Sequence, residues 1–267
     1  MKRTCEFADG GIRAASQAGI GLLILDNPAR KNAITAAMWR AIPEAIHWLC
    51  GEAQTRAIIL TGSGNRDFSA GADISEFPRV RKDTATARQY EAENSAAFAA
   101  VRNARVPVIA AIRGICYGGG FGLAAACDLR IADESAAFAV PAARLGLAYP
   151  ADAIQDFALS LGEQLARKAL YTGAPIRAAE LAGSGFLIET TDPEALDATA
   201  LSLAETIAAN APLSVQASKL AFRATAQNDD DLLREAEVIG ASTFDSADYA
   251  EGRAAFAEKR RPVFTGQ

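Results

Sequence analysis

The sequence predicts an α/β domain over residues 1–192 and an all-helical region over residues 193–267. In the first part, short apolar runs rich in β-branched residues alternate with segments of helical spacing. After Asp192-Pro193, four helical segments follow without a strand-like run, separated by turn-forming residues at 210–212 and 228–230. Because helices cannot extend a sheet, they must pack on the sheet, on each other or on another subunit.

Each expected strand or helix is indicated by a local feature of the sequence. Two strands at 12–16 and 20–25 flank a turn with Ala18-Gly19, and the later strands at 57–61, 108–112 and 129–132 are apolar throughout. The first helix, at 35–50, places Met38, Ile42 and Leu49 on one face, and Pro43 should kink or split it. The remaining helices are expected at 84–103, 120–126, 153–161, 194–210, 213–226, 232–242 and 247–261.

Composition excludes several classes of protein. Half of the 267 residues are apolar, which suffices for a sizeable core, and the net charge of −5 argues against nucleic acid or an anionic membrane as partner. Arg113 ends the longest apolar run, so no membrane span is expected. Four scattered cysteines and one histidine lack the spacing of metal ligands. We expect a soluble cytoplasmic protein without a metal site.

Two loops of small residues are the most informative feature of the sequence. Gly118-Gly119-Gly120 opens a short apolar helix, and Ala70-Gly71-Ala72 follows a strand about fifty residues upstream. Two such loops could simply mark close packing. If each presents one free backbone N–H, however, together they form an oxyanion hole.

The order of motifs around these loops resembles the crotonase superfamily, the enoyl-CoA hydratase/isomerase family. The resemblance covers nearly the whole chain. It runs through Asp26-Asn27-Pro28, Phe68-Ser69-Ala70-Gly71-Ala72-Asp73, Pro107-Val108-Ile109-Ala110, Gly118-Gly119-Gly120, Cys127-Asp128-Leu129-Arg130 and Lys259-Arg260-Arg261-Pro262.

The resemblance implies a spiral of ββα repeats with a C-terminal helical region that builds a homotrimer, often paired into hexamers. It implies an acyl-CoA substrate, with coenzyme A as part of the substrate and no separate cofactor. The N–H groups of Ala72 and Gly119 would bind the thioester oxygen.

Further positions are carried over as ligand contacts. Arg30 and Lys31 match a loop that grips coenzyme A, and Lys259 matches a lysine that reaches its phosphates across a subunit boundary. A cluster of cations at a helix end is the other interpretation of Lys259. Ala70, Asp73 and Ile74 complete the expected ligand-binding set, although Asp73 also suits a structural hydrogen-bonding role.

The sequence departs from the family at two positions. Hydratases of the family carry one glutamate at the position of Gly122 and another at the position of Ala142, so neither hydration nor isomerisation has its usual acid and base here. Tyr149 matches a tyrosine of methylmalonyl-CoA decarboxylases, and decarboxylation needs no base. Tyr149 could orient a carboxylate, protonate the product carbon, or only pack as an aromatic residue.

The sequence therefore favours a family lyase that stabilises a thioester enolate, with decarboxylation of a malonyl-type CoA as the best interpretation. Three alternatives stay open: an enoyl-CoA hydratase with non-standard residues, a non-catalytic CoA-thioester-binding subunit, and an acyl-CoA thioesterase. The last would use Asp152 as base or nucleophile, whereas Asp152 would more often cap the helix at 153–161.

Overall fold

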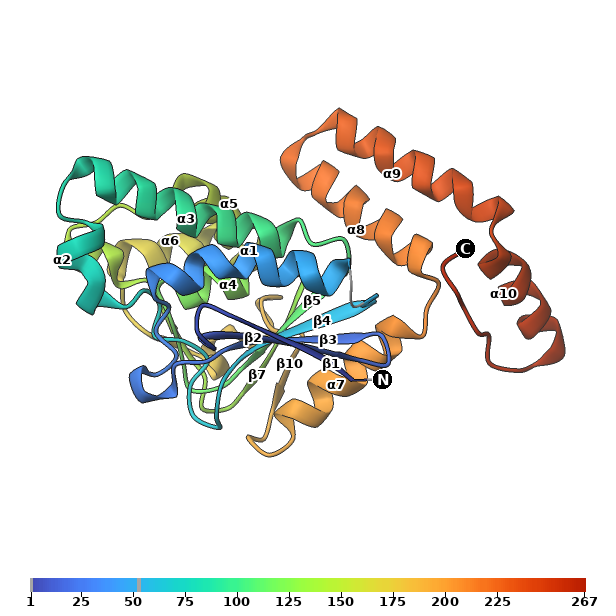
Figure 1. Ribbon diagram of the computed structural model, residues 1–267, viewed down its shortest axis with the longest axis horizontal. Coiled ribbons are helices and arrows are strands. Elements are labelled where there is room, and N and C mark those ends of the chain that lie inside the picture. The colour runs from blue at the N-terminus through green and yellow to red at the C-terminus, as the bar shows by residue number, and fades with distance from the viewer. Residues whose placement is uncertain (1, 52–53) are drawn as a thin grey trace.

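The computed structural model describes residues 2–51 and 54–267, which form two sheets surrounded by helices (Figure 1). A seven-stranded sheet has the order β1-β2-β3-β4-β5-β7-β10, and a three-stranded sheet has the order β6-β8-β9. The strands are β1 (Arg3–Phe7), β2 (Ile12–Gln17), β3 (Ile20–Leu25), β4 (Ala57–Gly62), β5 (Val108–Ile112), β6 (Ile115–Tyr117), β7 (Leu129–Asp133), β8 (Ala137–Ala139), β9 (Ile176–Arg177) and β10 (Glu189–Thr191).

Helices lie on both faces of the large sheet, with α1 (Ala36–Cys50) on one face and α7 (Leu196–Ala208) on the other (Figure 1). The other α-helices of the described residues are α2 (Phe77–Val80), α3 (Thr84–Arg102), α4 (Gly119–Ala126), α5 (Ala151–Leu161), α6 (Glu163–Thr172), α8 (Pro212–Gln227), α9 (Asp230–Ser242) and α10 (Ala247–Glu258). Because strand residues alternate between faces, β4 sends Ile58 and Leu60 into the main core, on the side of α1. Ile59 points to the other face, where it joins a smaller core with Leu196 and Ala200 of α7.

The chain winds as a spiral in which a strand of the large sheet is followed by a strand of the small sheet and then by a helix. This unit is seen in β5-β6-α4 and again in β7-β8-α5. In the turn before them, Ser69 forms an isolated parallel bridge with Cys116 of β6 and takes the place of the second strand. The loops that leave these three second strands therefore lie at the same edge, and the site is built there.

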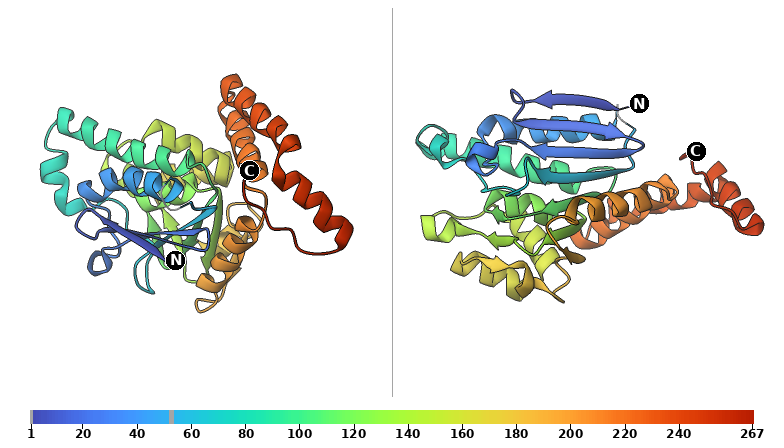
Figure 2. Two further views of the ribbon diagram at one scale, coloured as in Figure 1. Left: turned by 45° about the vertical axis from the view of Figure 1, so that its right-hand side comes forward. Right: turned by 90° about the horizontal axis from the view of Figure 1, so that it is seen from below.

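Helix α7 packs on the sheet, whereas α8, α9 and α10 extend away from the body (Figure 2). They remain attached to the core by specific polar contacts. Lys219 of α8 donates to Asp128 at 2.7 Å, and Arg56 donates to the carbonyl of Phe264 in the tail at 2.7 Å. In the described part of the chain, none of the helices is long and apolar enough to cross a membrane.

Most elements expected from the sequence are confirmed, with some differences. Pro43 does not split its helix, because α1 runs unbroken from Ala36 to Cys50 and is capped by the side chain of Thr35. Strands β1 and β10, helices α2 and α6, and the three-stranded sheet were not predicted. Of the three packing partners left open for the helices after residue 193, the first helix, α7, takes the sheet. The boundary at residue 192 itself stays a prediction.

Candidate active site

The loop that follows β4 is fastened to residues 31–34 by backbone hydrogen bonds. The N–H of Ala70 donates to the carbonyl of Lys31 at 2.8 Å, and the N–H of Asp73 donates to the carbonyl of Ile34 at 2.9 Å. The N–H of Gly71 donates to the side-chain oxygen of Ser69 at 3.1 Å. Within the described residues, the N–H of Ala72 is thus left without a partner between satisfied neighbours.

The second loop places Gly119 at the start of α4. Gly118, the residue before the helix, has a φ of 50° and donates its N–H to the carbonyl of Ala139 at 2.8 Å. Gly119 is the first helical residue, so its N–H points out of the helix and finds no acceptor in the part of the chain that the structure describes. The helix dipole adds positive potential at this amide.

The two loops are in direct contact, which explains their glycines. A Cβ atom on Gly71, whose φ is 86°, would lie 2.6 Å from the carbonyl oxygen of Tyr117 and 3.0 Å from the nitrogen of Gly119. A Cβ atom on Gly119 would lie 2.6 Å from the ring of Trp39 and 3.9 Å from the nitrogen of Ala72. The free amides of Ala72 and Gly119 are therefore close neighbours, which is what an oxyanion hole requires.

A cavity of about 110 Å³ lies beside these two amides. Of the described residues, those that line it include no aspartate, glutamate or histidine, so it offers no carboxylate or imidazole to a bound ligand. Three of the predicted ligand contacts, Ala70, Ala72 and Ile74, border the cavity. The full lining is Trp39, Ala70, Ala72, Ile74, Phe77, Arg81, Asn94, Phe98, Gly118, Gly119, Pro141, Ala142, Leu145, Leu147, Ala148, Tyr149 and Pro150.

Tyr149 fills the space that a glutamate at position 122 would need. A Cβ atom on Gly122 would lie 2.5 Å from the Tyr149 hydroxyl and 2.8 Å from the ring of Phe98. Gly122 has an ordinary helical backbone, so the obstacle to a side chain is this contact and not the backbone conformation. Ala142, the second position, borders the cavity.

The Tyr149 hydroxyl donates a hydrogen bond to the carbonyl oxygen of Gly118 at 2.9 Å. That carbonyl belongs to the same peptide unit as the N–H of Gly119. Burial raises the pKa of Tyr149 well above its ordinary range, so the phenol stays protonated and keeps this bond. Because hydrogen bonds along a chain polarise one another, the contact strengthens Gly119 as a donor.

Asp152 does not cap helix α5, contrary to the sequence interpretation. Pro150 occupies the cap position, and Asp152 lies in the first helical turn. Its carboxylate accepts a hydrogen bond from Ser95 at 3.0 Å and lies 3.8 Å from the guanidinium of Arg102. It is not among the residues that line the cavity. A catalytic role for Asp152 stays a prediction without support from its position.

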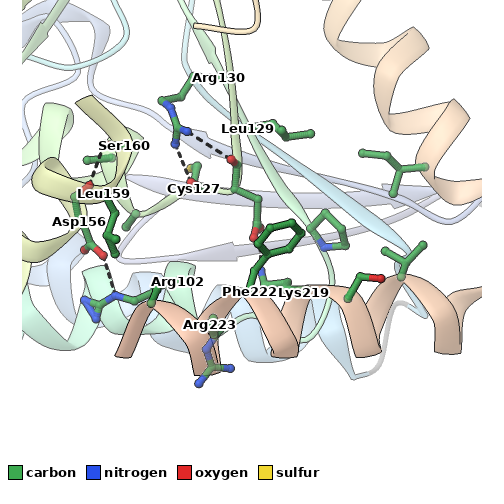
Figure 3. A pocket seen from close by; sticks show the side chains of 18 of the residues that line it. Arg102, Cys127, Leu129, Arg130, Asp156, Leu159, Ser160, Lys219, Phe222 and Arg223 are labelled. Carbon is green, nitrogen blue, oxygen red and sulfur yellow. Dashed lines mark hydrogen bonds and ion pairs between the residues drawn. The ribbon is translucent and has the colours of Figure 1, made fainter. Parts of the chain in front are cut away.

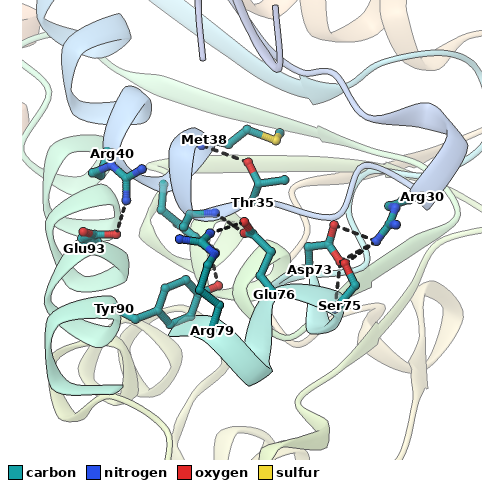
Figure 4. Close-up of polar contacts among 12 residues, drawn as sticks. Arg30, Thr35, Met38, Arg40, Asp73, Ser75, Glu76, Arg79, Tyr90 and Glu93 are labelled. Atoms are coloured by element: carbon teal, nitrogen blue, oxygen red, sulfur yellow. Dashed lines mark hydrogen bonds and ion pairs between the residues drawn. The ribbon is translucent and has the colours of Figure 1, made fainter. Parts of the chain in front are cut away.

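Arg30 and Asp73 are brought together on the outer side of the first loop (Figure 4). Arg30 contacts Asp73 at 2.9 Å, and Ser75 donates to the same carboxylate at 2.7 Å. Burial raises the pKa of Asp73, but the hydrogen bonds from Ser75 and the charge of Arg30 outweigh it, so the pKa is lowered overall. The structure thus gives Asp73 the structural role that the sequence left open, because its carboxylate holds the loop that carries Ala72.

The other two predicted cations, Lys31 and Lys259, are not among the residues that line the cavity. Lys31 is exposed in the loop that holds Ala70, and its contact with a ligand stays a prediction. Lys259 follows the last residue of α10, at the opposite end of the molecule from α2 (Figure 1). Within one chain it does not approach the two loops, so its assignment as a coenzyme A contact depends on a second subunit and stays a prediction.

Trp39, Arg81 and Asn94, which carry polar groups into the cavity wall, were not among the predicted site residues, and most of the apolar lining was not predicted either. Asn94 lies on the face of α3 that also carries Tyr90 and Phe98, one helical turn away on either side. An amide in the middle of a face that is otherwise aromatic and buried is a signal that the sequence contained. Arg81 lies just after α2, in a stretch whose placement no periodicity indicated.

A larger cavity of about 830 Å³ lies between the core and α8 (Figure 3). Most of its cations contact carboxylates or backbone carbonyls. Lys219 contacts Asp128 at 2.7 Å, Arg102 contacts Asp156 at 2.9 Å, and Arg130 donates to the backbone carbonyl of Cys127 at 2.6 Å. Buried atoms of Arg102, Asp156 and Arg223 have no hydrogen-bond partner among the described residues. The first two contacts connect α8 to the residue before β7 and α5 to α3.

The spiral fold and the two adjacent free amides are typical of a protein of the crotonase type. A family model described as enoyl-CoA hydratase/isomerase matches residues 15–267. The chain therefore belongs to the enoyl-CoA hydratase/isomerase family, as the motifs in the sequence indicated.

Individual relatives agree over almost the full length. The chain is 31% identical over 244 residues to a short-chain-enoyl-CoA hydratase of Clostridium acetobutylicum, covering 91% of this chain and 92% of the relative. It is 32% identical over 247 residues to a crotonyl-CoA hydratase of Syntrophomonas wolfei, covering 92% and 94%. A solved structure of an enoyl-CoA hydratase/carnithine racemase from Magnetospirillum magneticum matches with a TM-score of 0.89 at 35% identity, covering 96% of both chains.

Proposed function

We propose that this chain binds an acyl-CoA, stabilises its thioester enolate with the N–H groups of Ala72 and Gly119, and decarboxylates a malonyl-type acyl group. The observation that carries the proposal is a cavity with two adjacent unpaired amides and, among the described residues, no carboxylate or imidazole in its lining. Such a site stabilises negative charge but has no carboxylate or imidazole to abstract or deliver a proton.

Decarboxylation suits this site because the substrate itself supplies the electrons. The bond between Cα and the carboxylate breaks, CO₂ leaves, and the electron pair enters the enolate, whose oxygen accepts hydrogen bonds from Ala72 and Gly119. Cα then takes a proton from solvent. The Tyr149 hydroxyl proton is already donated to Gly118, which favours a role in positioning the Gly119 amide over proton transfer.

The alternatives have less support from the cavity. Hydration of an enoyl-CoA needs an acid and a base, and the positions of the family glutamates are Gly122, whose side-chain space Tyr149 occupies, and Ala142. A thioesterase would need Asp152, whose carboxylate is engaged by Ser95 outside the cavity lining. A non-catalytic CoA-binding subunit would have the same amides without turnover.

The test is turnover of a panel of malonyl-, methylmalonyl-, crotonyl- and aryl-CoA esters by the purified protein. We expect release of CO₂ from a malonyl-type ester and no hydration of crotonyl-CoA. Binding of these esters without any turnover would instead support the non-catalytic subunit, and release of free coenzyme A would support the thioesterase.

We also propose that the chain assembles as a homotrimer or hexamer through α8–α10. Large apolar side chains of this region are exposed in the single chain: Phe222 is 80% exposed, Phe244 71% and Phe256 87%. Apolar surface gathered on extended helices is typical of subunit contacts. Sedimentation at micromolar concentration should show a trimer or hexamer, and a clean monomer would contradict this and remove Lys259 from the ligand contacts.

A further inference from the structure

Two polar side chains in the acyl cavity have hydrogen-bonding groups without a partner. Asn94 is only 6% exposed, and its Oδ1 atom has no hydrogen-bond partner among the described residues. Arg81 lines the same cavity, and its buried Nε atom likewise lacks a partner in the described part of the chain. The Oδ1 atom of Asn94 is an acceptor and would not bind a carboxylate, but the amide N–H groups of Asn94 and the guanidinium of Arg81 are hydrogen-bond donors in the cavity wall, and a ligand with acceptor oxygens would satisfy them.

Arg81 is held in place by aromatic rings. Its guanidinium carbon lies 4.6 Å from the ring centre of Phe77 and 5.3 Å from that of Tyr90. The nearest carboxylate contact is long, 4.0 Å to Glu91, while the neighbouring Glu76 is engaged by Arg79 at 2.5 Å. The positive charge of Arg81 is therefore fixed but not neutralised by a close partner.

Trp39 contacts both Gly119 and Tyr90. The edge of its ring lies against Gly119, and its Nε1 donates a hydrogen bond to the hydroxyl of Tyr90 at 3.1 Å. Burial raises the pKa of Tyr90 to about 12, so this hydroxyl is neutral. The amide of Gly119, Asn94 and the guanidinium that lies over Tyr90 therefore border one cavity, so a single ligand in it can contact all three.

We propose that Arg81 is the receptor for a carboxylate carried by the acyl group, with the Nδ2–H donors of Asn94 beside it, so that the substrates are CoA esters of dicarboxylic acids. A guanidinium and amide N–H groups donate hydrogen bonds to a carboxylate, whereas an unsubstituted hydrocarbon chain would leave the charge of Arg81 without a counter-ion. The proposal rests on the acyl-CoA binding proposed above, but not on which bond the protein breaks.

The test compares the affinities of glutaryl-CoA and valeryl-CoA, which differ only in a carboxylate in place of the terminal methyl group. The wild type should bind glutaryl-CoA about tenfold more tightly or better. Arg81→Gln keeps most of the side chain but removes the charge, and should abolish this preference while leaving the affinity for valeryl-CoA unchanged. Asn94→Leu, of similar size, should weaken glutaryl-CoA binding several-fold.

Arg79→Gln is the matched control, since Arg79 is a neighbouring arginine that pairs with Glu76 and does not line the cavity. It should keep the preference for glutaryl-CoA. Equal affinities of the wild type for both esters, or a preference that survives Arg81→Gln, would overturn the receptor while leaving acyl-CoA binding intact. Failure of the wild type to bind either ester would overturn acyl-CoA binding and the receptor with it.

Discussion

Two cavities in the described part of this protein differ in how their polar groups are satisfied. In the larger one, beside α8, Lys219, Arg102 and Arg130 contact carboxylates or backbone carbonyls of the chain itself, although Arg223 keeps a buried Nε without a partner among the described residues. In the smaller one, the amides of Ala72 and Gly119 point at empty space with no acceptor in the described residues. Size therefore does not identify the functional site here. Unpaired donors that are held rigidly do, because an enzyme stabilises a developing charge with groups oriented in advance.

The largest effect is expected from Gly119→Val, which places a side chain in the smaller cavity. The new side chain would collide with Trp39 at 2.6 Å and close the approach to the amide. Loss of one oxyanion donor costs about 10²–10³-fold in turnover, so activity should fall at least that far. Activity assays on the best substrate, with circular dichroism to confirm folding, measure this.

The control for this variant is Gly240→Ala, at a helical glycine of α9 whose surroundings are open. It should keep full activity. Wild-type turnover by a folded Gly119→Val protein would show that this amide does not contact the reacting oxygen.

Asp128→Asn should show that the larger cavity contributes to the stability of the protein and not to its turnover. It removes the partner of the Lys219 ammonium, whose side chain is 6% exposed, while Asp128 is 30% exposed. Breaking a buried ion pair leaves an uncompensated charge, and here the free energy of unfolding should fall by about 3 kcal/mol, moderated by the exposure of Asp128. Turnover per folded molecule should not change.

Denaturant titration measures this loss of stability. Asp231→Asn provides the comparison, because Asp231 pairs with Arg234 on an exposed helix and such pairs contribute roughly 0–1 kcal/mol. If Asp128→Asn lost activity and kept its stability, the larger cavity would belong to the chemistry.

A smaller effect is expected from Tyr149→Phe, which tests the role of the Tyr149 hydroxyl in the active site. The variant keeps the ring but loses the bond to the Gly118 carbonyl, and a hydrogen bond of about 1 kcal/mol corresponds to roughly fivefold slower turnover. Binding of a plain acyl-CoA should barely change. Because burial raises the pKa of Tyr149, the hydroxyl stays protonated at and above neutral pH, and the wild-type rate should be flat between about pH 7 and about pH 9.

A group that transfers the proton would behave differently. If Tyr149 transferred the proton, Tyr149→Phe would remove activity altogether instead of slowing it several-fold. That result would assign Tyr149 to the chemistry itself and not to the position of the Gly119 peptide.

Much of this fold could be predicted from the sequence, because local patterns determine it. The apolar run of β4 and the glycines before α4 are visible without a structure. Strand β1 was missed, since its partly exposed residues alternate only weakly. The packing partner of α7 stayed open, because periodicity shows an apolar face but not the surface that covers it.

The site was predictable only in part. Small residues in two loops indicated the amides of Ala72 and Gly119, since only backbone can fit such a contact. The contact between Tyr149 and the space beside Gly122 joins residues 27 positions apart and has no local signature. The same holds for Arg81, whose position depends on stacking against Tyr90 of the following helix.

The central claim is that the smaller cavity stabilises an enolate without any protein acid or base. The most direct test is to follow crotonyl-CoA and malonyl-type CoA side by side with the unmodified protein, recording loss of the enoyl thioester absorbance and release of CO₂. We expect CO₂ from the malonyl-type ester and little or no hydration of crotonyl-CoA, because neither Gly122 nor Ala142 can hold the water or move its protons. Rapid, stereospecific hydration of crotonyl-CoA would contradict this, and would mean that other residues replace both glutamates.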